Sequence, residues 1–214
     1  MHLEVWLAFV GAAVAISVSP GAGAIQSMVT GLNHGLKRGF WSVAGLQIGL
    51  MLQLIVVALG LGAAVAKSVT AFTVIKWIGV AYLVYLAVQQ WRTRPTALAD
   101  QVGADAADPN AGGRWTLLTR GLLVNVTNPK GMVFLLAVLP QFVDPARPLL
   151  PQYLTIGVTM MVVDVAVMGA YTGMAARLMG WLQTPRQQIA MNRTFSCLFA
   201  GAAVVLSLLR RSTA

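Results

Sequence analysis

The chain has 214 residues, of which 57% are hydrophobic and only 10% are charged, whereas a soluble domain carries about 25% charged residues. This composition excludes an ordinary soluble domain, and apolar runs of about 18 residues or more predict helices that cross a membrane. The formal net charge is +9, but the basic residues lie at the ends of the apolar runs, where membrane topology favours them. We therefore expect the lipid bilayer as a partner and no nucleic acid.

A disulfide within the chain is excluded, because Cys197 is the single cysteine. The two histidines lie near predicted membrane edges, and no cluster has the spacing of a metal site, so we expect no metal and no cofactor. The first residues, Met1–Glu4, lack Lys and Arg. The following apolar run Val5–Ile16 is therefore interpreted as a membrane helix in preference to a cleaved signal peptide, which needs a positive start.

Six apolar spans are predicted in chain order, with boundaries good to about four residues. They cover Leu3–Gln26, Phe40–Ala66, Val74–Trp91, Trp115–Val143, Tyr153–Met179 and Phe195–Leu209. The segment 92–114 is polar and rich in helix-breaking residues. We expect an all-α integral membrane protein with a first three-helix repeat at 1–91, a cytoplasmic linker at 92–114 and a second three-helix repeat at 115–214.

The orientation is predicted from the basic residues of the short loops. Lys and Arg are more numerous after the first, third and fifth predicted spans than on the other face. We therefore place these loops in the cytoplasm and both termini outside, although Arg210 and Arg211 count against this assignment.

Two proline motifs interrupt the first span of each half. Ser19–Gly21 reads Ser-Pro-Gly, Asn128–Lys130 reads Asn-Pro-Lys, and the two prolines are 109 residues apart. Because each half has three spans, the second half must be inverted relative to the first. Interrupted segments at matching positions of two inverted halves indicate a transport site, whereas a single proline would be interpreted as a packing kink.

The chemistry of these motifs suits an anionic group. Proline breaks a helix, and Ser19 and Asn128 are good N-cap residues that can start a new half-helix. The unpaired N–H groups of such a start attract a carboxylate, and Lys130 adds a positive charge. The predicted substrate-binding residues are Ser19, Pro20, Gly21, Gly23, Gln26, Asn125, Asn128, Pro129 and Lys130.

Asp164 lies near the middle of the fifth span, where a charged side chain costs at least about 2.5–3.5 kcal/mol to insert. It is predicted either to carry a proton or to bind a substrate ammonium, and the alternative is a structural ion pair, for instance with Lys130. Gln47 is expected to hydrogen-bond between helices and Tyr82 to pack against other helices, and both are further candidates for the lining of the cavity.

Two GxxxG motifs, Gly45 with Gly49 and Gly169 with Gly173, lie in the matching middle spans of the two halves. Small residues at this spacing let helices approach closely. They predict packing or sliding surfaces, either within one chain or between subunits, and the oligomeric state stays open.

Taken together, these motifs give the chain a family likeness. It resembles the LysE/RhtB family of bacterial amino-acid exporters, in particular its homoserine and homoserine-lactone efflux branch. The resemblance covers nearly the whole chain and rests on Ser19-Pro20-Gly21, Leu32-Asn33-His34-Gly35, Ala44-Gly45-Leu46-Gln47, Val124-Asn125, Asn128-Pro129-Lys130, Pro140-Gln141-Phe142 and Val162-Val163-Asp164. Ala22 departs from the family pattern, in which a second proline is common, and this departure leaves the first break itself in place.

The resemblance implies a multi-pass protein of the bacterial inner membrane that exports small amino acids or their derivatives, driven by the proton gradient. The implied substrates are homoserine and its lactone, with threonine as a further candidate. Our hypothesis is alternating access, with the substrate near Gly21, Gly23 and Lys130 and with Asp164 exchanging a proton. The alternatives are a passive channel, an exporter of a different amino acid, a structural membrane partner, and an intramembrane enzyme, for which no set of catalytic groups is evident.

Overall fold

The computed structural model describes residues 3–19, 21–65, 69–92, 112–144, 146–175, 177 and 185–208. The regular elements of this described part are all helices, so the predicted all-α class is confirmed. They are α1 (Leu3–Val18), α2 (Ala22–Val65), α3 (Val69–Arg92), α5 (Arg114–Val126), α6 (Pro129–Phe142), α7 (Leu149–Gly173) and α9 (Pro185–Leu208). Most of the predicted linker, residues 93–111, lies outside the described residues.

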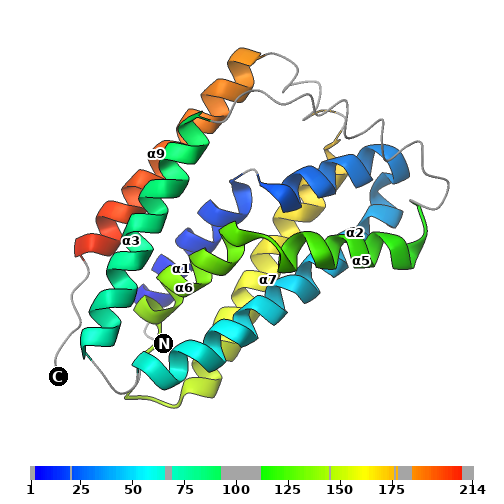
Figure 1. The fold of residues 1–214 in the computed structure, drawn as a ribbon. Coiled ribbons are helices and arrows are strands. Elements are labelled where there is room, and N and C mark those ends of the chain that lie inside the picture. Colours follow the sequence, from blue (N-terminus) through cyan, green and yellow to red (C-terminus); the bar gives the residue numbers. More distant parts are fainter. Residues whose placement is uncertain are drawn as a thin grey trace.

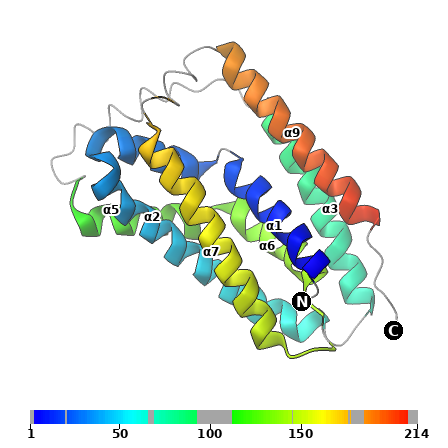
Figure 2. The same ribbon diagram turned by 180° about the vertical axis from the view of Figure 1, so that it is seen from behind.

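The long helix α2 consists of two stretches that meet at Gly35. This residue has φ 72° and ψ 172°, a conformation that glycine adopts readily because it lacks a Cβ atom. The stretches 22–34 and 36–65 on either side of it run in opposite directions (Figures 1 and 2). Residues 22–34 therefore continue the direction of α1 beyond the first break, and the chain turns back at Gly35.

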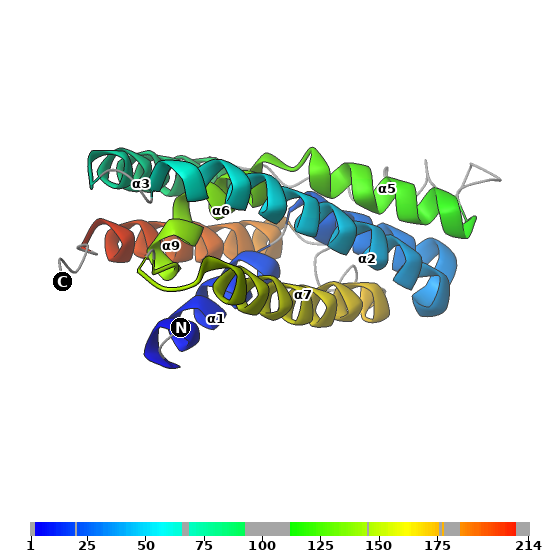
Figure 3. The same ribbon diagram turned by 90° about the horizontal axis from the view of Figure 1, so that it is seen from below.

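The helices run back and forth between two ends of the molecule (Figures 1 and 3). One end holds the start of α1, the end of α6 and the end of α9. The opposite end holds the Gly35 reversal, the end of α3 and the start of α5 (Figure 1). This arrangement brings the two proline motifs to the interior of the molecule, between its two ends.

Both predicted breaks lie at helix boundaries. Helix α1 ends at Val18 and α2 starts at Ala22, while α5 ends at Val126 and α6 starts at Pro129. The axes of α5 and α6 are bent by 54° at the second break. Proline explains the interruption, since it has no N–H to donate and its ring collides with the preceding turn.

Glycines allow α2 and α5 to pack closely. A Cβ atom on Gly45 would collide with the carbonyl oxygen of Leu118, and one on Gly121 would collide with that of Ser42. The predicted packing surface at Gly45 and Gly49 therefore lies within one chain. The second motif differs, because a Cβ on Gly169 would have no atom within 4 Å, so this glycine is not at a close helix contact in the described structure.

The buried side chains form separate clusters. The largest joins α1, α2, α6 and α7 and includes Phe9, Leu135 and Ile156, each almost fully buried. A second cluster joins α3 and α9 through Leu83, Phe195 and their neighbours. Helices α3 and α9 therefore form a pair of their own, which lies beside the remaining helices (Figures 1 and 2).

The outer surface is apolar over long stretches. Leu59 and Leu150 are 75% and 69% exposed, and large exposed apolar patches mark membrane or interaction surfaces. By length and composition alone, Leu149–Gly173 and the segment Ala22–Leu59, which contains the reversal at Gly35, are each long and apolar enough to cross a membrane. The bent pair of α5 and α6 would make a third such span.

The last helix extends ten residues before the start of the last predicted apolar span. Helix α9 begins at Pro185 rather than at Phe195, because its first turns carry polar residues that a hydropathy reading assigns to a loop. One of these polar side chains forms a hydrogen bond with a neighbouring helix. Asn192 is buried and accepts a hydrogen bond of 2.9 Å from the Gln90 amide of α3.

Candidate functional site

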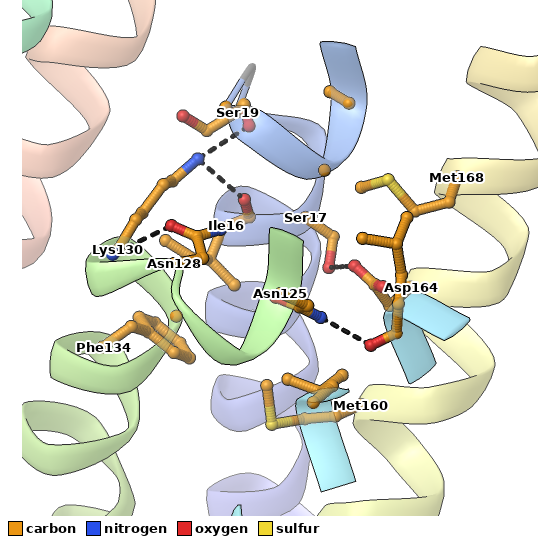
Figure 4. A pocket seen from close by; sticks show the side chains of 16 residues that line it. Ile16, Ser17, Ser19, Asn125, Asn128, Lys130, Phe134, Met160, Asp164 and Met168 are labelled. Atoms are coloured by element: carbon orange, nitrogen blue, oxygen red, sulfur yellow. Dashed lines mark hydrogen bonds between the residues drawn. The ribbon is translucent and has the colours of Figure 1, made fainter. Parts of the chain in front are cut away.

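A cavity of about 60 Å³ lies where the two breaks meet α7 (Figure 4). Its polar lining comes from both halves of the chain and consists of Ser17, Ser19, Asn125, Asn128, Lys130 and Asp164, with Gly21, Gly23 and Gly131 beside them. Its apolar wall consists of Ile16, Ala24, Leu46, Leu50, Phe134, Met160 and Met168. The structure thus brings most of the predicted site residues together around one space.

The first break is held by side chains of the second half. The Lys130 ammonium donates hydrogen bonds of 2.7 Å to the Ser19 carbonyl and 3.3 Å to the Ile16 carbonyl. The Tyr171 hydroxyl donates a bond of 2.7 Å to the Val18 carbonyl. The last carbonyl groups of a helix have no partner within the helix, so these side chains satisfy the end of α1.

The second break has a cap on each side. Asn128 is the N-cap of α6, since its side chain accepts a bond of 3.0 Å from the Lys130 backbone N–H, and Pro129 occupies the first turn. On the other side, the Gln53 amide donates to the carbonyls of Asn125, Asn128 and Val126 at 2.7, 3.1 and 3.3 Å. Gln53 therefore does at the end of α5 what Lys130 does at the end of α1.

Asp164 joins three helices through two neutral donors. Ser17 of α1 donates a hydrogen bond of 2.9 Å to its Oδ1, and the Gln47 amide of α2 donates one of 2.6 Å to its Oδ2. Figure 4 shows the Ser17 contact on the α7 side of the cavity, with Lys130 on the opposite side. Within the described residues Asp164 and Lys130 form no ion pair with each other, so the structural ion pair considered above is not observed.

Several buried polar atoms in this region lack a hydrogen-bond partner in the described structure. They are Ser19 Oγ, Gln47 Oε1 and Gln53 Oε1. The N-cap interaction predicted for Ser19 is therefore absent, because α2 starts at Ala22, three residues later, rather than directly after the serine. The free Ser19 hydroxyl lines the cavity instead, where it can bond to water or substrate.

Two further predicted residues, Gln26 and Tyr82, lie away from the cavity lining. The Gln26 side chain bonds to the Thr30 and Ser42 hydroxyls at 3.1 and 3.4 Å and is not part of the cavity lining. Tyr82 packs against the α3–α9 cluster, with its ring centroid 5.7 Å from that of Tyr85. The packing expected first for Tyr82 is therefore observed, and Tyr82 is not part of the lining of this cavity. Pro20 lies outside the described residues.

Sequence reasoning missed several residues of the site. Ser17 and Tyr171 have polar groups within apolar runs, and this signal could have marked them as partners of the break and of Asp164. The apolar wall, including Phe134, Met160 and Met168, has no such signal, since in sequence these residues look like any buried core residue.

The cavity is small. A water molecule needs roughly 10–15 Å³ when volume is counted in this way, so 60 Å³ holds only a few waters. The described conformation therefore leaves room between the two breaks for a few waters and not for a whole amino acid.

A family model described as "LysE type translocator" matches residues 14–210 of the chain. The chain belongs to this family. LysE-type translocators are membrane transporters, so the protein is a transporter and not an enzyme.

Curated relatives agree with membership of the LysE-type translocators. The chain is 41% identical to the homoserine/homoserine lactone efflux protein of Salmonella typhimurium, over 99% of this chain and 100% of the relative. It is also 41% identical to an uncharacterized membrane protein of Vibrio cholerae, over 97% of this chain and 98% of the relative. The leucine efflux protein of an Enterobacter species is 26% identical over 96% of this chain and 95% of the relative. No solved structure matches this LysE-type chain.

Proposed function

We propose that this translocator exports small amino acids and their derivatives, with homoserine and homoserine lactone as the first candidates, in exchange for protons. The substrate assignment is supported by full-length similarity at 41% identity to a homoserine/homoserine lactone efflux protein. The exchange is supported by one structural observation, the carboxylate of Asp164 bound by Ser17 and Gln47 beside a cavity at two helix breaks.

The architecture that we propose is six transmembrane passes in two inverted repeats, in the bacterial inner membrane. Two contacts support it. A Cβ on Gly21 would lie 3.4 Å from the Lys130 side chain, and Ser196 donates a hydrogen bond of 2.6 Å to the Ala87 carbonyl, 109 residues away in sequence. Gly21 and Lys130 are separated by the same 109 residues. Contacts between equivalent positions are expected along the two-fold axis of an inverted repeat.

The substrate carboxylate binds, in this proposal, at the starts of α2 and α6. Helix N-termini carry unpaired N–H groups and a partial positive charge, and Gly21, Gly23 and Gly131 in the cavity lining keep the backbone accessible. An ammonium group has three donors, and Lys130 uses two of them on carbonyl oxygens. The third donor is available for the substrate carboxylate.

Proton exchange at Asp164 supplies the coupling. The ionised carboxylate accepts bonds from Ser17 and Gln47, whereas a protonated carboxyl group must also donate one. The Gln47 Oε1 atom is buried without a partner, so rotation of this amide presents an acceptor to the new O–H group. Protonation therefore changes the bonds between α7, α2 and α1, and it removes the charge that would bind the substrate ammonium.

The test is uptake of labelled homoserine into inside-out vesicles with an acidic interior, where efflux appears as uptake. We expect proton-driven accumulation with the wild type, loss of that accumulation with Asp164→Asn, and strongly reduced transport with Pro129→Ala. Full activity of both variants would discard the assigned residues, and uptake indifferent to the gradient would favour a passive channel.

A different amino acid is the second candidate, because leucine efflux proteins are among the more distant relatives. Competition of unlabelled leucine and threonine with labelled homoserine, in the same vesicles, discriminates the two. If leucine competes more strongly than homoserine itself, the substrate assignment changes and the coupling mechanism stays.

A further inference from the structure

A second and larger cavity, of about 440 Å³, lies between α1, α6 and the α3–α9 pair. Its walls are mostly apolar and include Ala8, Ala12, Leu83, Val138, Phe195 and Leu198. By the measure applied to the first cavity it has room for roughly thirty waters, which is enough for a hydrated amino acid.

The larger cavity adjoins the site cavity. Ile16 and Phe134 line both spaces, and Phe134 is 5% exposed, so its ring is held between them. The Lys130 ammonium lies 5.5 Å from the centroid of the Phe199 ring, which also lines the larger cavity. The cation of the site, although it does not line the larger cavity, therefore lies behind the Phe199 part of its wall.

The other end of the larger cavity is polar. Glu4, from the first turn of α1, and Gln141, from the end of α6, both line it. The Gln141 Nε2 atom is buried with no hydrogen-bond partner in the described structure. These helix ends lie at the end of the molecule opposite to the Gly35 reversal (Figure 1), and the basic-residue distribution predicts that they face the outside.

We propose that the larger cavity is the passage by which the substrate leaves the site toward the outer face, and that the Phe134 ring is the partition which closes it. This inference rests on the proposed function. Polar groups at both ends of the space and an apolar wall between them suit the passage of a small molecule that has an uncharged side chain. A groove for a lipid acyl chain would need a polar group at its headgroup end alone.

The wall of the passage comes from two units with separate buried clusters. Helices α3 and α9 have their own buried cluster, whereas α1 and α6 belong to the cluster that surrounds the site. A small movement of the α3–α9 pair away from α6 would widen the space beside Phe134, and the ring could then change rotamer without a change in the break itself.

The experiment is cysteine labelling in a Cys197→Ser background. Val138→Cys lines the passage, and Leu136→Cys is the matched control, since Leu136 lies two residues away on the same helix and is exposed on the apolar exterior. Right-side-out vesicles are treated with a charged, membrane-impermeant maleimide. We expect Val138→Cys to react at least ten times faster than Leu136→Cys, and saturating homoserine to slow that reaction.

Phe134 is tested in the same system. Phe134→Ala joins the two cavities, so we expect the vesicles to leak homoserine without a proton gradient. Phe134→Leu keeps most of the bulk of the side chain and should leak less.

Two outcomes of the cysteine labelling would overturn the passage. One is equal labelling of the two cysteines. The other is labelling of Val138→Cys by an apolar permeant maleimide alone, which would indicate a groove for a lipid chain. Homoserine transport by each cysteine variant separates the hypotheses. Transport with an unreactive Val138→Cys refutes the passage only, and absence of transport in the parent background refutes the proposed function.

Discussion

The Lys130 ammonium, at the start of α6, donates a hydrogen bond of 2.7 Å to the carbonyl oxygen of Ser19, at the end of α1. A cation is unfavourable at a helix start and favourable at a helix end, so its position is set by α1 rather than by its own helix. The second half of the chain thus supplies the charged group that bonds to the carbonyls at the helix break of the first half.

Replacement of Lys130 by methionine should therefore affect more than substrate binding. Loss of its bonds leaves the Ile16 and Ser19 carbonyls without their donor, and a buried unsatisfied group costs about 1–3 kcal/mol. We expect a lower thermal unfolding midpoint in detergent and loss of homoserine uptake. Lys37→Met, at an exposed position, is the control and should change neither. Normal stability of Lys130→Met would show that water replaces the ammonium.

Gln53→Met should destabilise the second break. The Gln53 amide serves three carbonyls at the junction of α5 and α6, and methionine has a similar size without the donor. We expect a loss of about 1–3 kcal/mol, measured as a lower unfolding midpoint, with Leu52→Met on the exposed face as control. An unchanged midpoint would mean that the α5 end does not depend on this cap.

Gln47 and Asp164 should act as one unit. Because the Gln47 amide donates directly to the Asp164 carboxylate, the effects of Gln47→Leu and Asp164→Asn on proton-driven uptake should not add, as is usual for residues in one hydrogen-bonded network. Homoserine counterflow without a gradient should persist in Gln47→Leu, which keeps the Asp164 carboxylate. Additive losses in the double variant would show that Gln47 acts independently of the acid.

The glycines of α2 and α7 should differ in their tolerance to alanine. Gly45→Ala places a methyl group against the Leu118 carbonyl and forces α2 and α5 apart, whereas Gly169→Ala meets open space. We expect reduced stability and transport for the first variant. The second should be neutral or more stable by up to about 1 kcal/mol, because alanine favours a helix. Loss of function in Gly169→Ala would instead indicate that another molecule covers this glycine.

Much of this arrangement could be predicted from the sequence. Proline with a flanking cap residue marks a helix boundary by local chemistry alone, so the breaks near Ser19 and Asn128 were predictable. An acid within an apolar run must face the interior, which identified Asp164. The partners of the breaks were harder to predict, because the pairing of Lys130 with Ser19, or of Gln53 with Asn125, depends on how distant helices pack.

The failures have the same origin. Gln26 follows the first break by only a few residues, yet it faces the Thr30 and Ser42 hydroxyls, since the reversal at Gly35 brings the two stretches of α2 together. Tyr82, a second candidate for the cavity lining, instead packs in the α3–α9 pair, as its first interpretation predicts. Sequence proximity to a motif does not reveal the direction in which a side chain points.

The contact between Gly21 and Lys130 joins equivalent positions of the two halves that carry unequal side chains. Suppose that the two halves exchange conformations during the transport cycle. Lys130 then leaves the end of α1, and Gly21 occupies the equivalent position in the other half. Glycine has no side chain, so no ammonium group bonds to the carbonyls of the corresponding helix end. The two extreme conformations then differ in free energy even without substrate or gradient. The resting molecule would therefore favour the conformation that opens to one side of the membrane, and each cycle would begin from that conformation.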